Sequence, residues 1–173
     1  MPQSRLNQIA LSVVVAAWLT PSVTLAQAAA PPNGQFGDWV LAQYTEGRNR
    51  TCYMGATPQD STPKNISRGN VYVNVTHKPG VRDEVNINFG YTFEANAEVT
   101  VTIDGQAFKM FTNAGSAWNR TPDEDAKMVK AMAAGTRMTV KGKSNRGTET
   151  TDTYSLSDFT AAHTAMGKAC PAR

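Results

Sequence analysis

The sequence predicts a mainly β protein, an antiparallel β-sandwich with two short helices. Apolar and polar residues alternate in several short segments, turn dipeptides separate these segments closely, and two segments have the apolar spacing of a helix. A parallel sheet is disfavoured, because the helices do not alternate with the strands. A partly closed β-barrel is the alternative to the sandwich.

About eight strands are expected from the alternation and the turn signals. Residues 98–111 are predicted to form a hairpin, because Asp104-Gly105, a dipeptide that favours a type I′ turn, separates two alternating runs. The threonine-rich run at 148–154 is typical of a half-exposed strand. The other strands are expected at 39–44, 51–56, 71–75, 85–89 and 138–140.

The first helix is expected to begin at Pro122. Thr121 is suited to be its N-cap, Glu124 completes a capping box, and further acidic residues in the first turn suit the positive end of the helix dipole. Gly135 fits the C-terminal cap. The apolar residues that can share the buried face of this helix are Met128, Val129 and Met132.

The second helix is expected from about Asp158 to Lys168, with Ser157 as its cap. Its inward face would carry Phe159, Ala162 and Met166. His163 falls within this helix, and we interpret it as a helix-surface residue.

Residues 1–28 are predicted to be a cleavable secretory signal peptide. The basic residue Arg5 precedes an apolar run at 9–19, and Ala26-Gln27-Ala28 fits the small-residue cleavage pattern. The apolar run is too short to span a bilayer, and no later segment is apolar enough to do so. We therefore expect a periplasmic or extracellular protein with no transmembrane segment in the mature chain.

After the signal, we expect a flexible leader at 29–35 and a single domain over 36–173. Export would place Cys52 and Cys170 in an oxidising compartment, where a disulfide between them is the default. This disulfide would tie the C-terminus to an early strand. Redox chemistry is the alternative for the pair, but the chain has no C-x-x-C motif.

Composition and motif spacing argue against several functions. The formal net charge of +3 is too small for a dominant nucleic-acid field. His77 precedes the turn Lys78-Pro79-Gly80 and is interpreted as a solvated loop residue, and the spacings H-x-H and H-x-x-x-H are absent. Asp83 and Glu84 would point to opposite faces of a strand, so they do not form the carboxylate pair of a glycosidase. We expect no catalytic residue, no metal ligand and no cofactor.

One basic segment could bind a ligand. Lys141, Lys143 and Arg146 place three cations at the end of one hairpin. They could bind an acidic or sulfated polysaccharide, or acidic lipid headgroups, through screened electrostatic attraction. The alternative is a solvated turn without a ligand.

Several stretches of the sequence together resemble a known family. They are F-G-D-W at 36–39, S-A-W at 116–118, the run 152–162 that contains S-L-x-x-F-T-A-A, and K-A-C at 168–170. The chain resembles the invasion-associated locus B family of bacterial exported proteins over essentially its whole mature length. The resemblance implies a β-sandwich-like fold, a periplasmic or envelope location, and no known enzymatic activity. Unlike many members, this chain has no cysteine shortly after Trp39 and no further cysteine pair in mid-chain.

The leading hypothesis is a non-enzymatic exported protein that acts by binding in the periplasm or at the envelope. Its partner would be an envelope or host protein or an acidic polysaccharide, and the resemblance implies a contribution to host-cell invasion or envelope integrity. The alternative is a secreted hydrolase whose site is assembled from scattered residues that the sequence does not reveal.

Overall fold

A computed structural model describes residues 33–171 and shows one continuous antiparallel sheet of 11 strands with two helices. The strand order is β1-β2-β3-β5-β6-β9-β8-β7-β10-β11-β4. The predicted signal peptide, 1–28, lies outside the described residues. The strands are β1 (Gly34–Phe36), β2 (Trp39–Glu46), β3 (Asn49–Ala56), β4 (Asp60–Thr62), β5 (Tyr72–Lys78), β6 (Val81–Asn88), β7 (Glu98–Ile103), β8 (Gln106–Asn113), β9 (Ser116–Trp118), β10 (Arg137–Lys143) and β11 (Glu149–Ser155).

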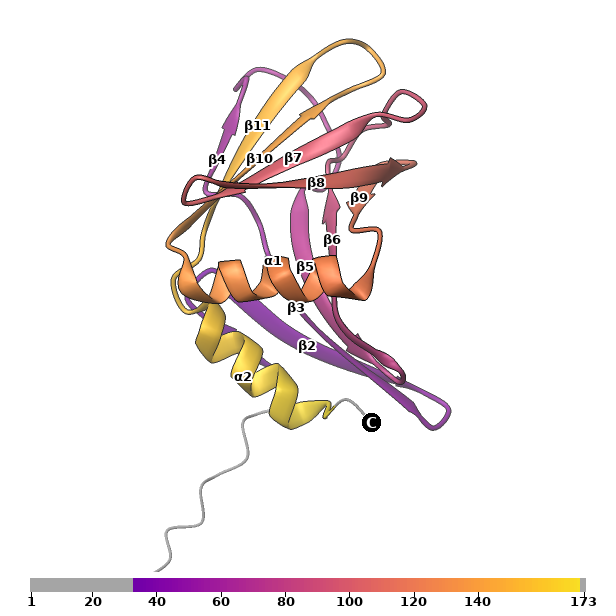
Figure 1. Cartoon of the computed structure of the whole chain (residues 1–173), viewed down its shortest axis with the longest axis vertical. Helices are drawn as coiled ribbons and strands as arrows, with labels where there is room; N and C mark the ends of the chain where they lie inside the picture. Colours follow the sequence, from indigo (N-terminus) through magenta and orange to yellow (C-terminus); the bar gives the residue numbers. More distant parts are fainter. Residues whose placement is uncertain (1–32, 172–173) are drawn as a thin grey trace, which may run out of the picture.

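The mainly antiparallel fold with two helices is confirmed, and the sheet does not close into a barrel, because β1 and β4 are its two edges. Figure 1 shows the sheet curling so that the part with β7, β8, β10 and β11 lies above the part with β2 and β3. Helix α1 (Pro122–Ala134) runs between these parts and packs against β6, and α2 (Phe159–Ala169) packs against β1, β2 and β3.

The structure has more strands than the eight expected, because β1, β4 and β9 are each three residues long. A three-residue strand is too short for the alternation of side chains to be recognised. Gly34 and Gln35, the last two residues of the leader predicted at 29–35, pair with β2. Residues 29–32 lie outside the described part of the chain.

Local signals set the predicted hairpin and the first helix. Asp104 and Gly105, between β7 and β8, both have positive φ, as a type I′ turn requires. Thr121 Oγ1 accepts a hydrogen bond from the Glu124 amide at 3.2 Å, which confirms the N-cap of α1. The Glu124 carboxylate accepts from the amide of Arg120 rather than from that of the cap itself.

The predicted cap of α2 is wrong. Asp158, not Ser157, stands at the N-cap position, with φ of 62° and no side-chain cap hydrogen bond. The inward face of α2 is as predicted, since Phe159, Ala162 and Met166 are buried. The edge of the Phe159 ring packs on the buried Trp39 ring, with centroids 4.9 Å apart. This contact joins α2 to the sheet core.

The disulfide between Cys52 and Cys170 is present in the structure. It joins β3 to the residue that follows α2, and its two residues are 118 positions apart in the sequence. Both α2 and the C-terminal end of the described chain are thereby attached to an early strand, as predicted. Neither helix of the described residues has the length and apolar character needed to cross a membrane.

Candidate functional site

A polar cleft opens between the β10–β11 turn and two loops that flank β5 and β6. Its volume is about 480 Å³. The cleft is lined by Ile66, Ser67, Arg68, Gly90, Tyr91, Thr92, Ser144, Asn145, Arg146, Thr148 and Thr150. The lining is thus dominated by hydroxyl, amide and guanidinium groups, with one aromatic ring.

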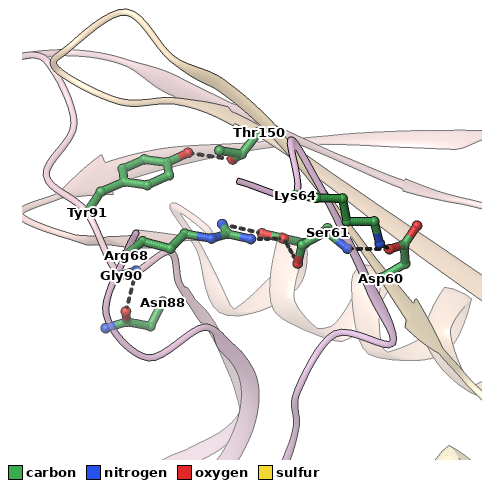
Figure 2. A network of polar contacts seen from close by, with 9 residues as sticks. Asp60, Ser61, Lys64, Arg68, Asn88, Gly90, Tyr91 and Thr150 are labelled. Carbon is green, nitrogen blue, oxygen red and sulfur yellow. Dashed lines mark hydrogen bonds and ion pairs between the residues drawn. The ribbon is translucent and has the colours of Figure 1, made fainter. Parts of the chain in front are cut away.

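A buried ion pair forms one wall of the cleft. Arg68 Nη1 donates to Asp152 Oδ2 at 2.9 Å, and Nη2 donates to the other carboxylate oxygen. The side chain of Arg68 is 9% exposed and that of Asp152 is fully buried. Ser61 Oγ also donates to this carboxylate at 2.6 Å, and Figure 2 shows the labelled side chains of Arg68 and Ser61 pointing toward one another. The hydrogen bond to Asp152 raises the pKa of Arg68, against the opposing effect of burial.

Two tyrosine hydroxyls lie near this ion pair, that of Tyr91, which follows β6, and that of Tyr154 on β11. Tyr91 and Thr150 share a hydrogen bond of 2.8 Å between their hydroxyls, and Figure 2 shows it above Arg68. Burial raises the pKa of Tyr91 and of Tyr154. Among the described residues, the Tyr154 hydroxyl is the one buried side-chain polar atom without a hydrogen-bond partner. Thr150, Asp152 and Tyr154 are all buried on the same face of β11.

Glycines allow the cleft loops to approach closely. Gly90 has φ of 68°, and a Cβ there would lie 2.5 Å from the carbonyl oxygen of Gly69. The Gly69 amide donates to the Gly90 carbonyl at 2.8 Å, and the Gly90 amide donates to Asn88 Oδ1 at 2.9 Å. Gly142 makes room beneath the cleft, because a Cβ there would lie 2.8 Å from the Tyr91 hydroxyl oxygen.

The three predicted polyanion-binding residues divide between two surfaces. Arg146 is exposed and lines the cleft. Lys141 and Lys143 are exposed on β10 and line a separate depression that also contains Glu98 and Glu149. Lys143 lies directly opposite Glu149 in the strand pairing. Glu98 and Glu149 weaken the positive potential around the two lysines. Of the three predicted residues, Arg146 is the one that lines the cleft.

The two histidines lie together, which the sequence interpretation missed. His77 is 1% exposed on β5, so its interpretation as a solvated loop residue is wrong. His77 Nε2 lies 2.7 Å from Asp83 Oδ1, and His163 Nε2 lies 2.6 Å from the same oxygen. His163 reaches this oxygen from α2 with a side chain that is 20% exposed, so it is not a simple surface residue. The cluster brings two imidazole nitrogens and a carboxylate oxygen within 4.8 Å of one another.

A bulge places the carboxylate of Asp83 between the two imidazoles. Thr76 pairs with Glu84 but Lys78 pairs with Val81, so two residues of β6 oppose His77. Asp83 has φ of 60°, a left-handed conformation that aspartate tolerates better than most residues. Burial tends to raise the pKa of Asp83, but the hydrogen bonds with His163 and His77 outweigh it and hold this pKa below its ordinary value.

Glu84, the neighbour of Asp83, has a different partner. Lys78 Nζ donates to both Glu84 carboxylate oxygens, at 2.9 and 3.1 Å. The carboxylates of Asp83 and Glu84 therefore bind different partners, as the strand geometry predicts. One signal could have located the cluster: Val73, Val75 and His77 follow the same period of two, which assigns the histidine to the buried face.

Comparisons with known proteins agree with the fold. A model of the family described as "Invasion associated locus B (IalB) protein" matches residues 39–167. The crystal structure of invasion associated protein B from Bartonella henselae superposes with a TM-score of 0.53 at 15% identity, covering 78% of this chain and 93% of that chain. At this identity, the superposition shows the fold alone. No curated protein matches the sequence. Because the family model spans most of the chain, the protein belongs to the invasion-associated locus B family.

Proposed function

We propose that the protein is exported to the periplasm or cell envelope and acts there by binding, without catalysing a reaction. The signal pattern at 1–28 and the disulfide support export. The ligand proposed for the polar cleft is an acidic polysaccharide. Contributions to envelope integrity or to host-cell entry would follow from this binding.

The observation that carries the proposal is the position of Arg146 in a cleft lined by hydroxyls. Arg146 is exposed and forms no salt bridge with any of the described residues, so its guanidinium is available to a carboxylate or sulfate group. The hydroxyls of Ser67, Thr92 and Thr148 can exchange hydrogen bonds with sugar hydroxyls. The Tyr91 ring adds an apolar face of the kind on which a sugar can pack.

A secreted hydrolase is the alternative function. Hydrolysis at this cleft would need a general base or a pair of carboxylates facing the ligand. The cleft lining contains neither histidine nor an acidic side chain, and Asp152 is fully buried behind Arg68. The composition of the lining therefore favours binding over hydrolysis.

The test compares two triple variants that remove the same charge. K141A/K143A/R146A removes the hairpin cations, whereas K127A/K130A/K168A removes three exposed lysines on α1 and α2. We expect the parent protein to bind an acidic polysaccharide such as heparin and to elute above about 0.15 M salt, where the Debye length is about 8 Å. The hairpin variant should lose about tenfold or more in affinity, and the helix variant less than about threefold.

Equal losses in the two triple variants would contradict a site at the hairpin, because only net charge would then matter. Elution of the parent below about 0.15 M salt would also contradict the proposal. A separate measurement tests export: the N-terminal sequence of the protein recovered from the periplasm should begin close to residue 29. Recovery of the uncleaved chain in the cytoplasm would rule export out.

A further inference from the structure

We propose that His77, Asp83 and His163 form a binding site for a divalent transition metal ion, with Zn²⁺ as the expected ion. The ligands would be the Nε2 atoms of the two histidines and the carboxylate of Asp83. These residues come from β5, β6 and α2, and they share no residue with the polar cleft. The inference is thus independent of polysaccharide binding.

The hydrogen-bonding capacity of His77 is the first argument. Its Nδ1 lies 3.3 Å from the carbonyl oxygen of Cys170, and its Nε2 lies 2.7 Å from Asp83 Oδ1. Both contacts are to acceptors, but a neutral imidazole carries one N–H. A neutral ring can donate to only one of these two acceptors, and a cation bound at Nε2 would leave Nδ1–H to donate to the carbonyl. Histidines that bind a metal through one ring nitrogen usually donate the N–H of the other nitrogen to a carbonyl or carboxylate, as Nδ1 could do here.

The sharing of one carboxylate oxygen is the second argument. His163 Nε2 also points at Asp83 Oδ1, at 2.6 Å, so two imidazole nitrogens converge on one atom. Tetrahedral Zn²⁺ with ligand bonds of about 2.0–2.2 Å separates its ligand atoms by about 3.3 Å. Opening the two contacts by about 0.6–0.7 Å, through side-chain rotations, would admit the ion.

Neighbouring residues orient the two histidines. Cys52, the disulfide partner of Cys170, lies directly opposite His77 in the pairing of β3 with β5, so the disulfide anchors the carbonyl that orients the His77 ring. The Phe159 ring stacks on His163, with centroids 5.9 Å apart and planes 8° from parallel. Preorganisation of this kind lowers the cost of ordering ligands when an ion binds.

Access and ligand chemistry decide which ion fits. The side chains of Asp83 and His163 are 13% and 20% exposed, whereas His77 is buried, so the cluster lies close to the protein surface. Arg82 Nε lies 3.4 Å from Asp83 Oδ2, which leaves Oδ1 for a monodentate bond to the metal. Two imidazoles with one carboxylate suit Zn²⁺, whereas Mg²⁺ and Ca²⁺ prefer oxygen ligands alone.

The composition of the chain makes the site easy to test. The whole sequence contains two histidines, both in this cluster, and its two cysteines are joined in the disulfide. Isothermal titration of the disulfide-bonded protein with zinc chloride should therefore give one tight site per chain. Excess Mg²⁺ should not displace the zinc, and a Co²⁺-loaded sample should show the visible absorption of a tetrahedral centre.

Two ligand variants and one control separate a metal site from nonspecific binding. H163A removes a partly exposed ligand, and D83N keeps a residue type that accepts the positive φ. Each should lower zinc affinity about tenfold or more. D104N is the matched control, because it makes the same substitution at another positive-φ aspartate and should bind zinc as the parent does. Circular dichroism of each variant checks that it is folded.

Two results would overturn the proposal. One is that the folded parent protein retains no zinc at micromolar free concentrations. The other is that H163A and D83N bind zinc as tightly as D104N. In either case, the cluster would be a histidine–carboxylate hydrogen-bond network without a metal.

Discussion

Two regions of the molecule bury charged or ionisable groups, and they satisfy these groups differently. In the polar cleft, Asp152 receives two hydrogen bonds from Arg68 and one from Ser61, so each acceptor faces a donor. In the histidine cluster, Asp83 Oδ1 faces two imidazole nitrogens, and His77 has more acceptors around its ring than a neutral imidazole has protons. The carboxylate of Asp152 is therefore fully paired, although the Tyr154 hydroxyl in the same wall has no hydrogen-bond partner. In the histidine cluster, the proposed metal ion would satisfy the two Nε2 contacts.

The two regions also differ in what ties their parts together. In the cleft wall, the loop residue Arg68 and Ser61 of β4 are joined to Asp152 of β11 by an ion pair and hydrogen bonds, without a covalent link. Near the histidine cluster there is also a covalent cross-link, because the Cys52–Cys170 disulfide holds the end of α2 against β3. A change at one region should therefore leave the other nearly intact, since the two share no residue.

The largest effect is expected from removal of the disulfide. The variant C52A/C170A releases a link between residues 118 positions apart, and the chain-entropy relation gives a loss of about 4–5 kcal/mol in the free energy of unfolding. Urea denaturation measures this loss. Hydrogen exchange should show faster opening of α2 than of β10 and β11. If hydrogen exchange becomes faster by the same factor in α2, β10 and β11, the disulfide does not stabilise the region of the histidine cluster separately from the cleft.

The next largest effect is expected from breaking the buried ion pair of the cleft. D152A leaves the Arg68 guanidinium buried without its partner, which should cost about 3–5 kcal/mol. The double variant R68M/D152L removes both charges and should recover most of that loss, because apolar side chains of similar size need no counter-ion. Urea denaturation of the three proteins compares them. A double variant as unstable as D152A would mean that the polar contacts themselves stabilise the wall.

Most of the fold could be predicted from local patterns. The β7–β8 hairpin follows from Asp104-Gly105, and α1 follows from Thr121 and Pro122, because a turn and a cap are chosen by adjacent residues. The disulfide could be predicted because the chain offers a single pairing. The three-residue strands could not, since they form only where longer strands supply their partners.

The residues that meet at the two sites are harder to predict from the sequence. Arg68 and Asp152 are 84 positions apart, and no local pattern relates a loop arginine to one residue of a threonine-rich strand. For His77, the turn at Pro79-Gly80 predicts a solvated loop, whereas the alternation of β5 continues through Lys78 and assigns the histidine to the buried face. Asp83 and His163 are 80 positions apart, and their contact depends on how α2 docks on the sheet.

A smaller effect is expected at the glycine that shapes the cleft. Gly90 and Gly80 both have positive φ, but a Cβ at Gly80 would meet nothing within 4 Å, whereas one at Gly90 would collide with the Gly69 backbone. G80A should therefore cost about 1 kcal/mol from backbone strain, and G90A about 2–3 kcal/mol from strain and collision. Thermal unfolding measures both. Equal losses would show that the loops of the cleft can separate without penalty.

The smallest effect on stability is expected at the second arginine of the cleft. Arg146 is exposed and has no salt bridge among the described residues, whereas Arg68 is buried against Asp152. R146A should change the free energy of unfolding by less than about 0.5 kcal/mol and still weaken binding to an acidic polysaccharide. K127A, an exposed lysine on α1, should change neither quantity. If R146A instead lowers stability and leaves binding unchanged, the guanidinium supports the turn between β10 and β11. The cleft would then lack the free cation on which its proposed function depends.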